Sequence, residues 1–432
     1  MFKLVMFMTI YDQVKNRRSY AVLGAVALLL APTAAFAKMG MVPLLVFGCL
    51  ASSRPSASWP IIWKTLTDWP LRLVGVLALW ALVSLTWAPS PNPFTIISVV
   101  TVGFLCVVFV TATSQLSDND TKSLQSLALL GGCLLIALLA EEHFTNAAIL
   151  RAARPEDALP RTGEWVPYLR LVAARGTSIL APLTFVLALL AYQKTTNPLA
   201  WALLIFCSLT VSWLLPMQAS TLAIVIGLVV FALVYFQPRF TIIIITIGII
   251  IYALLSPFLS AGLLTIGFLE DMGLDPSRNL RQRLAIWEYV SSLIGDHPIC
   301  GHGFDSSRAL GATGVKLADT GWDALPLHPH NAFLQIWLEL GGVGILIACM
   351  IVASIAHSLL RLAGKPLVAA THSATIAAIG VIALVSYGAW QHWWIATWGI
   401  VWGYLVLARK NSPSDFHSAK IDKNQPMSAG IK

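Results

Sequence analysis

The chain has 432 residues, of which 57% are hydrophobic and only 11% are charged, and its mean hydropathy is +0.76. A soluble domain carries about 25% charged residues, so most of this chain cannot face water. The net charge of +8 does not indicate a nucleic-acid partner, because the basic residues are scattered singly and form no cluster with interleaved aromatic side chains. Composition therefore predicts a membrane protein that does not bind nucleic acid.

Six cysteines are present, and all except Cys300 lie in apolar runs, where cysteine behaves as a small hydrophobic residue. Their spacing is not that of a metal site. We therefore expect neither a disulfide framework nor a bound metal or cofactor.

Apolar runs recur along the chain, and each approaches the roughly 20 residues that a membrane-spanning helix needs. They do not alternate apolar and polar residues as the strands of a barrel would. The sequence thus predicts an all-α polytopic membrane protein of about twelve transmembrane helices, at 20–37, 39–53, 72–88, 94–113, 123–142, 177–193, 198–214, 217–236, 240–262, 332–356, 371–387 and 389–408.

The first apolar run has two interpretations. It follows basic residues and ends in Ala35-Phe36-Ala37, which is typical of a cleaved signal peptide. A first transmembrane helix is favoured, because apolar segments continue throughout the chain. The run at 39–53 is short, and the break at Gly388 between the last two runs is only weakly marked.

Basic residues in the short connections predict the orientation. Lys15, Arg17 and Arg18 place the N-terminus in the cytoplasm, and an even number of spans leaves two longer segments outside. The predicted organisation begins with N-terminal transmembrane helices at 1–261, which include a smaller periplasmic loop at 143–176. A large periplasmic catalytic loop with amphipathic helices follows at 262–331. C-terminal transmembrane helices lie at 332–410, and a cytoplasmic tail lies at 411–432. The smaller loop holds five arginines on the translocated side, which suggests that it meets an anion.

The large loop contains three polar segments. In the first, apolar residues recur at helical spacing and predict an amphipathic helix, with Arg283 and Trp287 on one face. An interfacial helix with Trp at the headgroup level is the alternative. The second segment, 298–303, contains Gly301 and Gly303, which permit close backbone approach to a ligand.

The third segment places His328, His330 and Asn331 just before the chain re-enters the membrane. Histidine titrates near neutrality and can act as a general base. Two alternatives stay open. A metal site would need a third ligand, which the neighbouring sequence lacks, and a purely structural role would have a histidine capping the next helix.

Together these segments form an ordered set of motifs: R-x-x-x-W from Arg283, P-x-x-G-x-G from Pro298 and H-N-x-x-L-Q-x-x-x-E-x-G from His330. The set resembles the O-antigen ligase and O-antigen polymerase superfamily of bacterial envelopes. The resemblance implies glycosyl transfer at the periplasmic face of the inner membrane, from undecaprenyl diphosphate to a sugar hydroxyl of lipid A–core in the ligases or to another repeat unit in the polymerases. It also implies metal-independent, inverting chemistry.

By the same resemblance, His330 matches the catalytic histidine and Arg283 the diphosphate-binding arginine of the family. This fits the chemistry, since a guanidinium pairs bidentately with phosphate and a neutral imidazole can take the proton of an attacking hydroxyl. Further substrate-binding candidates are Trp287, Gly301, Gly303, His328 and Asn331. An apolar groove between helices, among the membrane lipids, would hold the polyprenyl tail.

One departure from the family pattern stands out. Many members carry a second arginine near the start of the helix two spans before the motifs, where this chain reads Met-Gln-Ala-Ser-Thr at 217–221. Either another arginine supplies the charge or diphosphate binding differs in this chain. Arg175 is the first candidate substitute and Arg308 the second, and the alternative for both is an interfacial anchor.

Three functions remain to be compared. A glycan ligase or repeat-unit polymerase accounts for the motif set. A transporter would be expected to keep ionisable residues or broken helices near the membrane midplane, whereas here they gather at the ends of the predicted spans. A non-catalytic scaffold gives no reason for the segments that contain Arg283 and His330.

Overall fold

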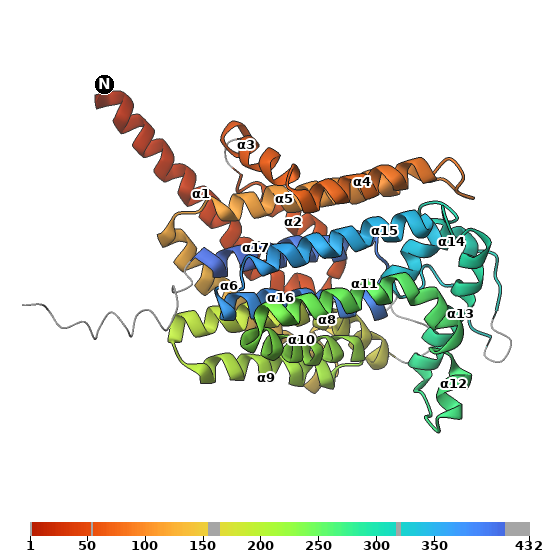
Figure 1. Ribbon diagram of the computed structural model, residues 1–432. Coiled ribbons are helices and arrows are strands. Elements are labelled where there is room, and N and C mark those ends of the chain that lie inside the picture. Colours follow the sequence, from red (N-terminus) through yellow and green to blue (C-terminus); the bar gives the residue numbers. More distant parts are fainter. Residues whose placement is uncertain (1, 53–54, 154–164, 317–320, 411–432) are drawn as a thin grey trace, which may run out of the picture.

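The computed structural model describes residues 2–52, 55–153, 165–316 and 321–410, and within these ranges the chain forms helices and no strands. It is an all-α polytopic membrane protein, as predicted (Figure 1). The helices are α1 (Phe2–Phe36), the 3-10 helix η1 (Lys38–Gly40), α2 (Met41–Cys49), α3 (Pro55–Leu66), α4 (Trp69–Ser84), α5 (Pro93–Ser114), α6 (Asp118–Phe144), α7 (Ala148–Ala153), α8 (Trp165–Thr195), α9 (Pro198–Leu214), α10 (Gln218–Phe236), α11 (Pro238–Gly262), α12 (Ile266–Asp271), α13 (Arg278–Asp296), α14 (Ser306–Gly311), α15 (Ala332–Leu360), α16 (Pro366–Val385) and α17 (His392–Lys410). The tail at 411–432 lies outside the described residues.

Each of the twelve predicted apolar runs coincides with a helix, but the count of twelve spans is not confirmed. In the described part of the chain, eight helices are long and apolar enough to cross a membrane, or nine if α3 and α4, bent by 69°, form one broken span. Helix α2 has only 9 residues, which cover about 14 Å of a hydrocarbon core of about 30 Å. The break near Gly388 is real, because α16 ends at Val385 and α17 begins at His392.

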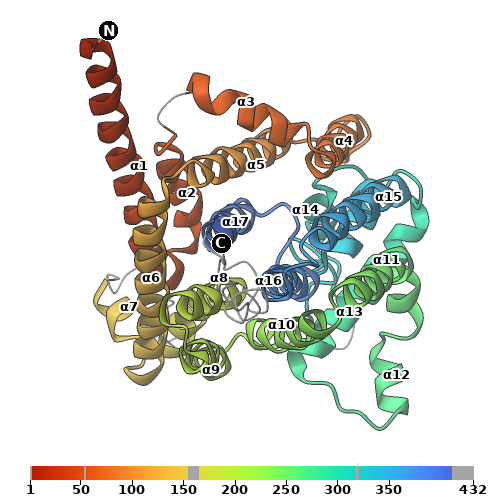
Figure 2. The same ribbon diagram turned by 60° about the vertical axis from the view of Figure 1, so that its left-hand side comes forward.

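The first apolar run is packed into the bundle. A side chain at Gly131 of α6 would lie 2.0 Å from the carbonyl oxygen of Ala27, and one at Gly176 of α8 would lie 2.7 Å from that of Ala34. Glycine lets these three backbones touch, as small residues do at helix contacts in membranes. Figure 2 shows α1 crossing beside α6, with α8 and α9 next to them.

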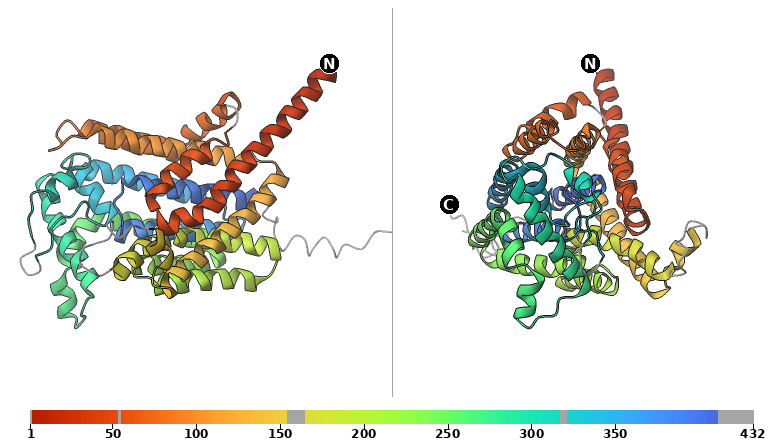
Figure 3. Two further views of the ribbon diagram at one scale, coloured as in Figure 1. Left: turned by 180° about the vertical axis from the view of Figure 1, so that it is seen from behind. Right: turned by 90° about the vertical axis from the view of Figure 1, so that its right-hand side faces the viewer.

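The end of the bundle that carries α12, α13 and α14 is called the loop end here; it lies on the right in Figure 1 and on the left in the rear view of Figure 3. The predicted amphipathic helix is confirmed as α13. Its apolar face, with Leu284, Trp287, Val290 and Ile294, packs on Leu334 and Leu338 of α15. Trp287 therefore points into the protein, and the interfacial alternative for this side chain is wrong.

Helix α15 is interrupted at Gly341, whose φ of 65° and ψ of −164° are not helical. The interruption frees carbonyl groups one turn earlier, and a buried carbonyl needs a partner. The 298–303 turn supplies it: the N–H groups of His302 and Gly303 donate to the carbonyls of Leu338 (2.8 Å) and Glu339 (2.9 Å). In return, Gly342 N–H donates to the carbonyl of Pro298 at 2.8 Å. The glycine-rich motif thus binds the broken helix.

Candidate functional site

His330 lies in the loop immediately before α15 with a left-handed backbone, φ +58°. This conformation is uncommon outside glycine and must be held by neighbours. The Nδ1 atom of His330 lies 2.5 Å from the carbonyl oxygen of Ser386. Because a carbonyl can only accept, Nδ1 carries the proton, and in the neutral ring Nε2 keeps a free lone pair. That nitrogen can receive a proton from a substrate.

Two predicted substrate-binding residues hold this loop in place. The N–H of His330 donates to Nδ1 of His328 at 3.2 Å, and the two rings meet edge to face at 4.4 Å. The indole N–H of Trp287 donates to the carbonyl of Pro329 at 3.0 Å. Both side chains contact the segment that carries His330, so their geometry is that of positioning residues.

Asn331 is the N-cap of α15. Its Oδ1 accepts the N–H groups of Phe333 and Leu334, and its Nδ2 donates to the hydroxyl of Tyr252 at 2.8 Å. The capping alternative proposed for this segment is therefore right about the role and wrong about the residue, since the cap is asparagine and not histidine.

Arg283 projects from α13 toward His330, and the two side chains line a pocket of about 80 Å³ together with Asn279, Gln282 and Ile286. Arg283 is half-buried and forms no ion pair with any residue in the described ranges. By contrast, Arg281 on the same helix pairs with Glu270 and Asp275, each at 2.7 Å. A half-buried guanidinium without a carboxylate is suited to bind an anionic group.

Burial, and secondarily the nearby Arg283 charge, lower the pKa of His330 below its usual 6.5. Burial also lowers the pKa of Arg283, but a guanidinium remains charged at any physiological pH. At neutral pH the pocket therefore combines a neutral imidazole with a permanent positive charge.

Three more cations, Arg308, Lys38 and Arg175, act on groups in or next to this site. Burial, followed by the charges of His330, Arg308 and Lys38, lowers the pKa of His328 to about 3. The Nζ atom of Lys38 lies 4.5 Å from the ring centre of Trp393 and 5.2 Å from that of Tyr387. Burial and the nearby Arg175 lower the pKa of Lys38 to about 8. The loop end is thus positively charged around a pair of neutral histidines.

The position of the missing family arginine is occupied by hydroxyl groups. Ser220, in the first turn of α10, accepts a hydrogen bond from Thr177 at 2.8 Å and lies 3.2 Å from the hydroxyl of Ser178. Ser178 in turn lies 3.1 Å from the hydroxyl of Tyr387, the ring that Lys38 covers. In the described structure this position therefore carries hydroxyl groups and no cation.

The predicted substitutes differ in how they are engaged. Arg308 is paired with Asp305 at 3.0 Å. Of the five loop arginines, Arg154 and Arg161 lie outside the described residues, and Arg151 and Arg170 donate to backbone carbonyls of the same loop. Arg175 has neither a carboxylate nor a carbonyl partner in the described part of the chain, and its charge acts electrostatically on Lys38 and Tyr387.

Sequence reasoning missed Lys38. Its signal is weak, because a single lysine in a short turn between apolar runs usually indicates only topology.

The glycines of the 298–303 turn approach the protein backbone closely. A side chain on Gly301 would lie 2.5 Å from the carbonyl carbon of Glu339, and one on Gly303 would lie 2.6 Å from Cα of Ala88. Both residues have positive φ values, 69° and 96°. Their role is to let the turn dock on the break in α15.

Glu339 connects the site's supporting segments. One carboxylate oxygen accepts hydrogen bonds from Ser307 (2.5 Å) and Gln335 (3.0 Å), and the other accepts from Asp305 N–H (2.9 Å) and the Trp390 indole (2.6 Å). Gln335 also accepts from Ala389 N–H at 2.8 Å. Through these bonds α15 fixes both α14 and the 386–391 connection that holds His330.

Among the described residues, no group of three or more His, Cys, Asp or Glu side chains is arranged to hold a metal ion. The site instead offers a fixed histidine, unpaired arginines and a lysine at one end of a helical bundle. These features define a multi-pass membrane protein with a cationic pocket at its loop end.

Comparison with known proteins is consistent with this description. The O-antigen ligase family profile matches residues 217–349, which include Arg283, the glycine-rich turn and His330. A protein named "Putative polysaccharide ligase" from Rickettsia bellii is 30% identical over 334 residues, covering 76% of this chain and 77% of that protein. A similarly named protein from Rickettsia conorii is 29% identical over 358 residues, which cover 80% of this chain and 83% of that protein. The chain belongs to the O-antigen ligase family.

Substituting Glu339→Gln should destabilise the loop end. The glutamine amide keeps only one acceptor oxygen, because an NH2 group replaces the other. At least one of the two donors that bond to the replaced oxygen then loses its partner, which costs about 1–3 kcal/mol. The thermal unfolding midpoint in detergent should fall, and Glu288→Gln on the exposed face of α13 is the matched control. An unchanged midpoint for Glu339→Gln would show that the network does not support the fold.

Proposed function

We propose that this protein transfers a glycan from undecaprenyl diphosphate to a sugar hydroxyl in cell-envelope polysaccharide synthesis. The observation that carries the proposal is the shared pocket of Arg283 and His330, which joins an unpaired guanidinium to a neutral imidazole. Family membership supports the reaction class. We further propose that the 262–331 loop faces the periplasm from the bacterial inner membrane.

In the proposed reaction, Nε2 of His330 takes the proton of the acceptor hydroxyl as its oxygen attacks the anomeric carbon. The bond from that carbon to the diphosphate oxygen breaks, and the leaving diphosphate gains negative charge. Arg283 lies where it can pair with that charge and stabilise it in the transition state. The Ser386 carbonyl keeps the proton on Nδ1 and stabilises the imidazolium that forms.

We propose that Arg175 and Lys38 supply the charge that the missing family arginine would have given, with Arg308 as a more distant contributor. Lys38 and Arg175 come from η1 and α8, and both act on Tyr387. Neither has a carboxylate partner in the described segments. Together with Arg283, these two cations would neutralise a diphosphate without a metal ion.

A lipid A–core acceptor makes the protein a ligase, and a second repeat unit makes it a polymerase. Both reactions use the same base and leaving-group site, so the pocket of Arg283 and His330 accommodates either. We propose the ligase reaction first, since the matched family profile and both relatives are described as ligases.

Removing either catalytic group should stop transfer. In proteoliposomes supplied with lipid-linked glycan, His330→Ala and Arg283→Ala should each lower the transfer rate at least about 100-fold, the usual scale for losing a general base or an electrostatic stabiliser. Arg281→Ala is the matched control, because Arg281 lies on the same helix but is paired with Glu270 and Asp275. Wild-type rates in both catalytic variants would refute the proposed function.

The pH dependence should show the lowered pKa of His330. Protonated His330 cannot act as a base, so kcat/KM should fall as the pH drops, with a midpoint below 6.5 because burial and Arg283 favour the neutral ring. His328, with its pKa of about 3, stays neutral over this range and adds no step. A midpoint above 7 would contradict the assignment of His330 as the base.

Donor binding should depend on the second cationic group. Lys38→Met and Arg175→Gln should each raise KM for the lipid diphosphate about tenfold, or about 1.4 kcal/mol, and Lys38→Arg should retain most of the affinity. Lys64→Met, at an exposed position of α3, is the control. Unchanged KM values in both variants would remove Lys38 and Arg175 from the donor site and leave the roles of Arg283 and His330 intact.

A further inference from the structure

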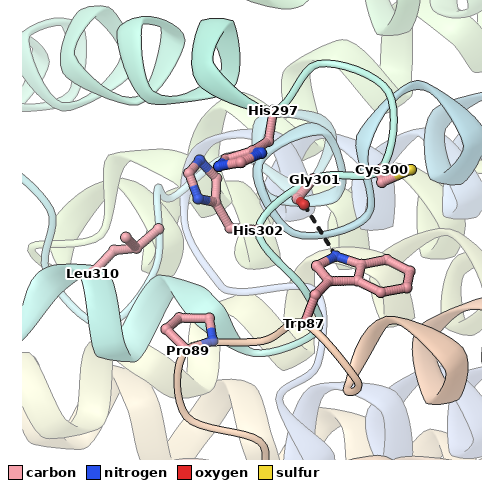
Figure 4. A pocket seen from close by; sticks show the side chains of 7 residues that line it. All are labelled: Trp87, Pro89, His297, Cys300, Gly301, His302 and Leu310. Atoms are coloured by element: carbon pink, nitrogen blue, oxygen red, sulfur yellow. Dashed lines mark hydrogen bonds between the residues drawn. The ribbon is translucent and has the colours of Figure 1, made fainter.

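A second, larger cavity opens at the loop end, separate from the pocket of Arg283 and His330. Its volume is about 450 Å³, which falls in the range of small-ligand sites, about 300–1,000 Å³. Its walls come from the α4–α5 connection, from the turn that follows α13, and from α14 itself (Figure 4). The lining residues are Trp87, Pro89, His297, Cys300, Gly301, His302 and Leu310.

Trp87 is a fixed aromatic wall of this cavity. Its indole N–H donates to the carbonyl of Gly301 at 3.1 Å, so the ring is held by one edge (Figure 4). The side chain is nevertheless 39% exposed. An indole whose polar edge is satisfied and whose ring remains accessible offers a flat apolar surface to a ligand.

The polar side chains that line the cavity are two histidines and a cysteine. The Nε2 atom of His302 lies 2.9 Å from the carbonyl oxygen of Leu293, so Nε2 donates and Nδ1 remains an acceptor. The ring of His297 meets His302 edge to face at 4.6 Å. Among the residues that the structure describes, neither a carboxylate nor a Lys or Arg side chain lines the cavity.

The two cavities therefore differ in chemistry. The pocket of Arg283 and His330 is cationic and suits a diphosphate, whereas the described lining of the Trp87 cavity combines an aromatic surface with hydrogen-bonding groups and no Lys, Arg, Asp or Glu, which suits an uncharged polyhydroxylated ligand. A transfer between two substrates needs a place for each. We propose that the Trp87 cavity binds the acceptor saccharide, an inference that rests on the proposed glycosyl transfer.

The cavity is built on the same rigid unit as the catalytic histidine. Its Gly301–His302 turn is hydrogen-bonded to the broken segment of α15, which begins directly after His330 and Asn331. On α14, Leu310 lines the cavity while the charge of Arg308 acts on His328. The cavity and the histidines are thus both close to α14, and the cavity would hold the acceptor sugars that extend beyond the one that reacts.

Cys300 provides a direct probe, because its thiol is exposed and lines the cavity. The full chain is placed in proteoliposomes with the other five cysteines replaced by alanine and with His330→Ala to prevent turnover. Dephosphorylated core oligosaccharide from bacterial lipopolysaccharide should slow maleimide labelling of Cys300 several-fold, and inorganic pyrophosphate should not. Equal labelling with and without the oligosaccharide, or protection only by a phosphocholine headgroup analogue, would overturn the proposal.

Kinetics give an independent check in the otherwise native protein. Trp87→Leu should raise KM for the acceptor about tenfold while KM for the donor stays unchanged, and Trp87→Phe should have a smaller effect. Trp213→Leu, at an exposed position of α9, is the control. If Trp87→Leu leaves acceptor KM unchanged while wild-type protein transfers glycan, the acceptor site is wrong and the function stands. A wild-type protein that transfers nothing would instead refute the proposed function.

Discussion

The interruption of α15 at Gly341 is the constraint on which the loop end depends. A continuous helix would pair its own carbonyls and leave none to accept hydrogen bonds from the 298–303 turn. Because Gly341 leaves the helical conformation, the carbonyls of Leu338 and Glu339 accept hydrogen bonds from the 298–303 turn. The same turn forms one wall of the Trp87 cavity, while the first half of α15 follows directly from His330. One break therefore links the loop to the bundle and the proposed acceptor site to His330.

A second layer of contacts orients His330 itself. Glu339 and Gln335, both on the first half of α15, hold the 386–391 connection through Trp390 and Ala389. That connection presents the Ser386 carbonyl to Nδ1 of His330. A left-handed histidine backbone costs about 1–3 kcal/mol. The hydrogen bonds just described, together with the one from the Trp287 indole to the Pro329 carbonyl, offset this cost. The chain thus keeps a strained residue in one orientation, as expected where a base must meet a substrate hydroxyl at a fixed place.

The sequence predicted the helices and the amphipathic face of α13 well, because both depend on local periodicity. The nearness of Arg283 to His330 followed from family resemblance and not from spacing, since nothing local shows that a helix of the loop folds back on the next span. Three features were out of reach for the same reason. The docking of Gly301 on α15, the Ser386 acceptor and the place of Lys38 over Tyr387 all depend on contacts between segments far apart in the chain. Runs such as 39–53 also look like spans in sequence but form helices too short to cross alone.

The central claim is that the fold holds His330 neutral, with its proton on Nδ1 and its Nε2 free. Nitrogen-15 NMR of histidine-labelled protein in proteoliposomes at pH 7 measures this directly, with the His330 signal assigned by its loss in His330→Gln. The account predicts a neutral imidazole in the Nδ1–H tautomer. An imidazolium, or a neutral ring protonated on Nε2, would contradict it, because neither could accept a proton at Nε2.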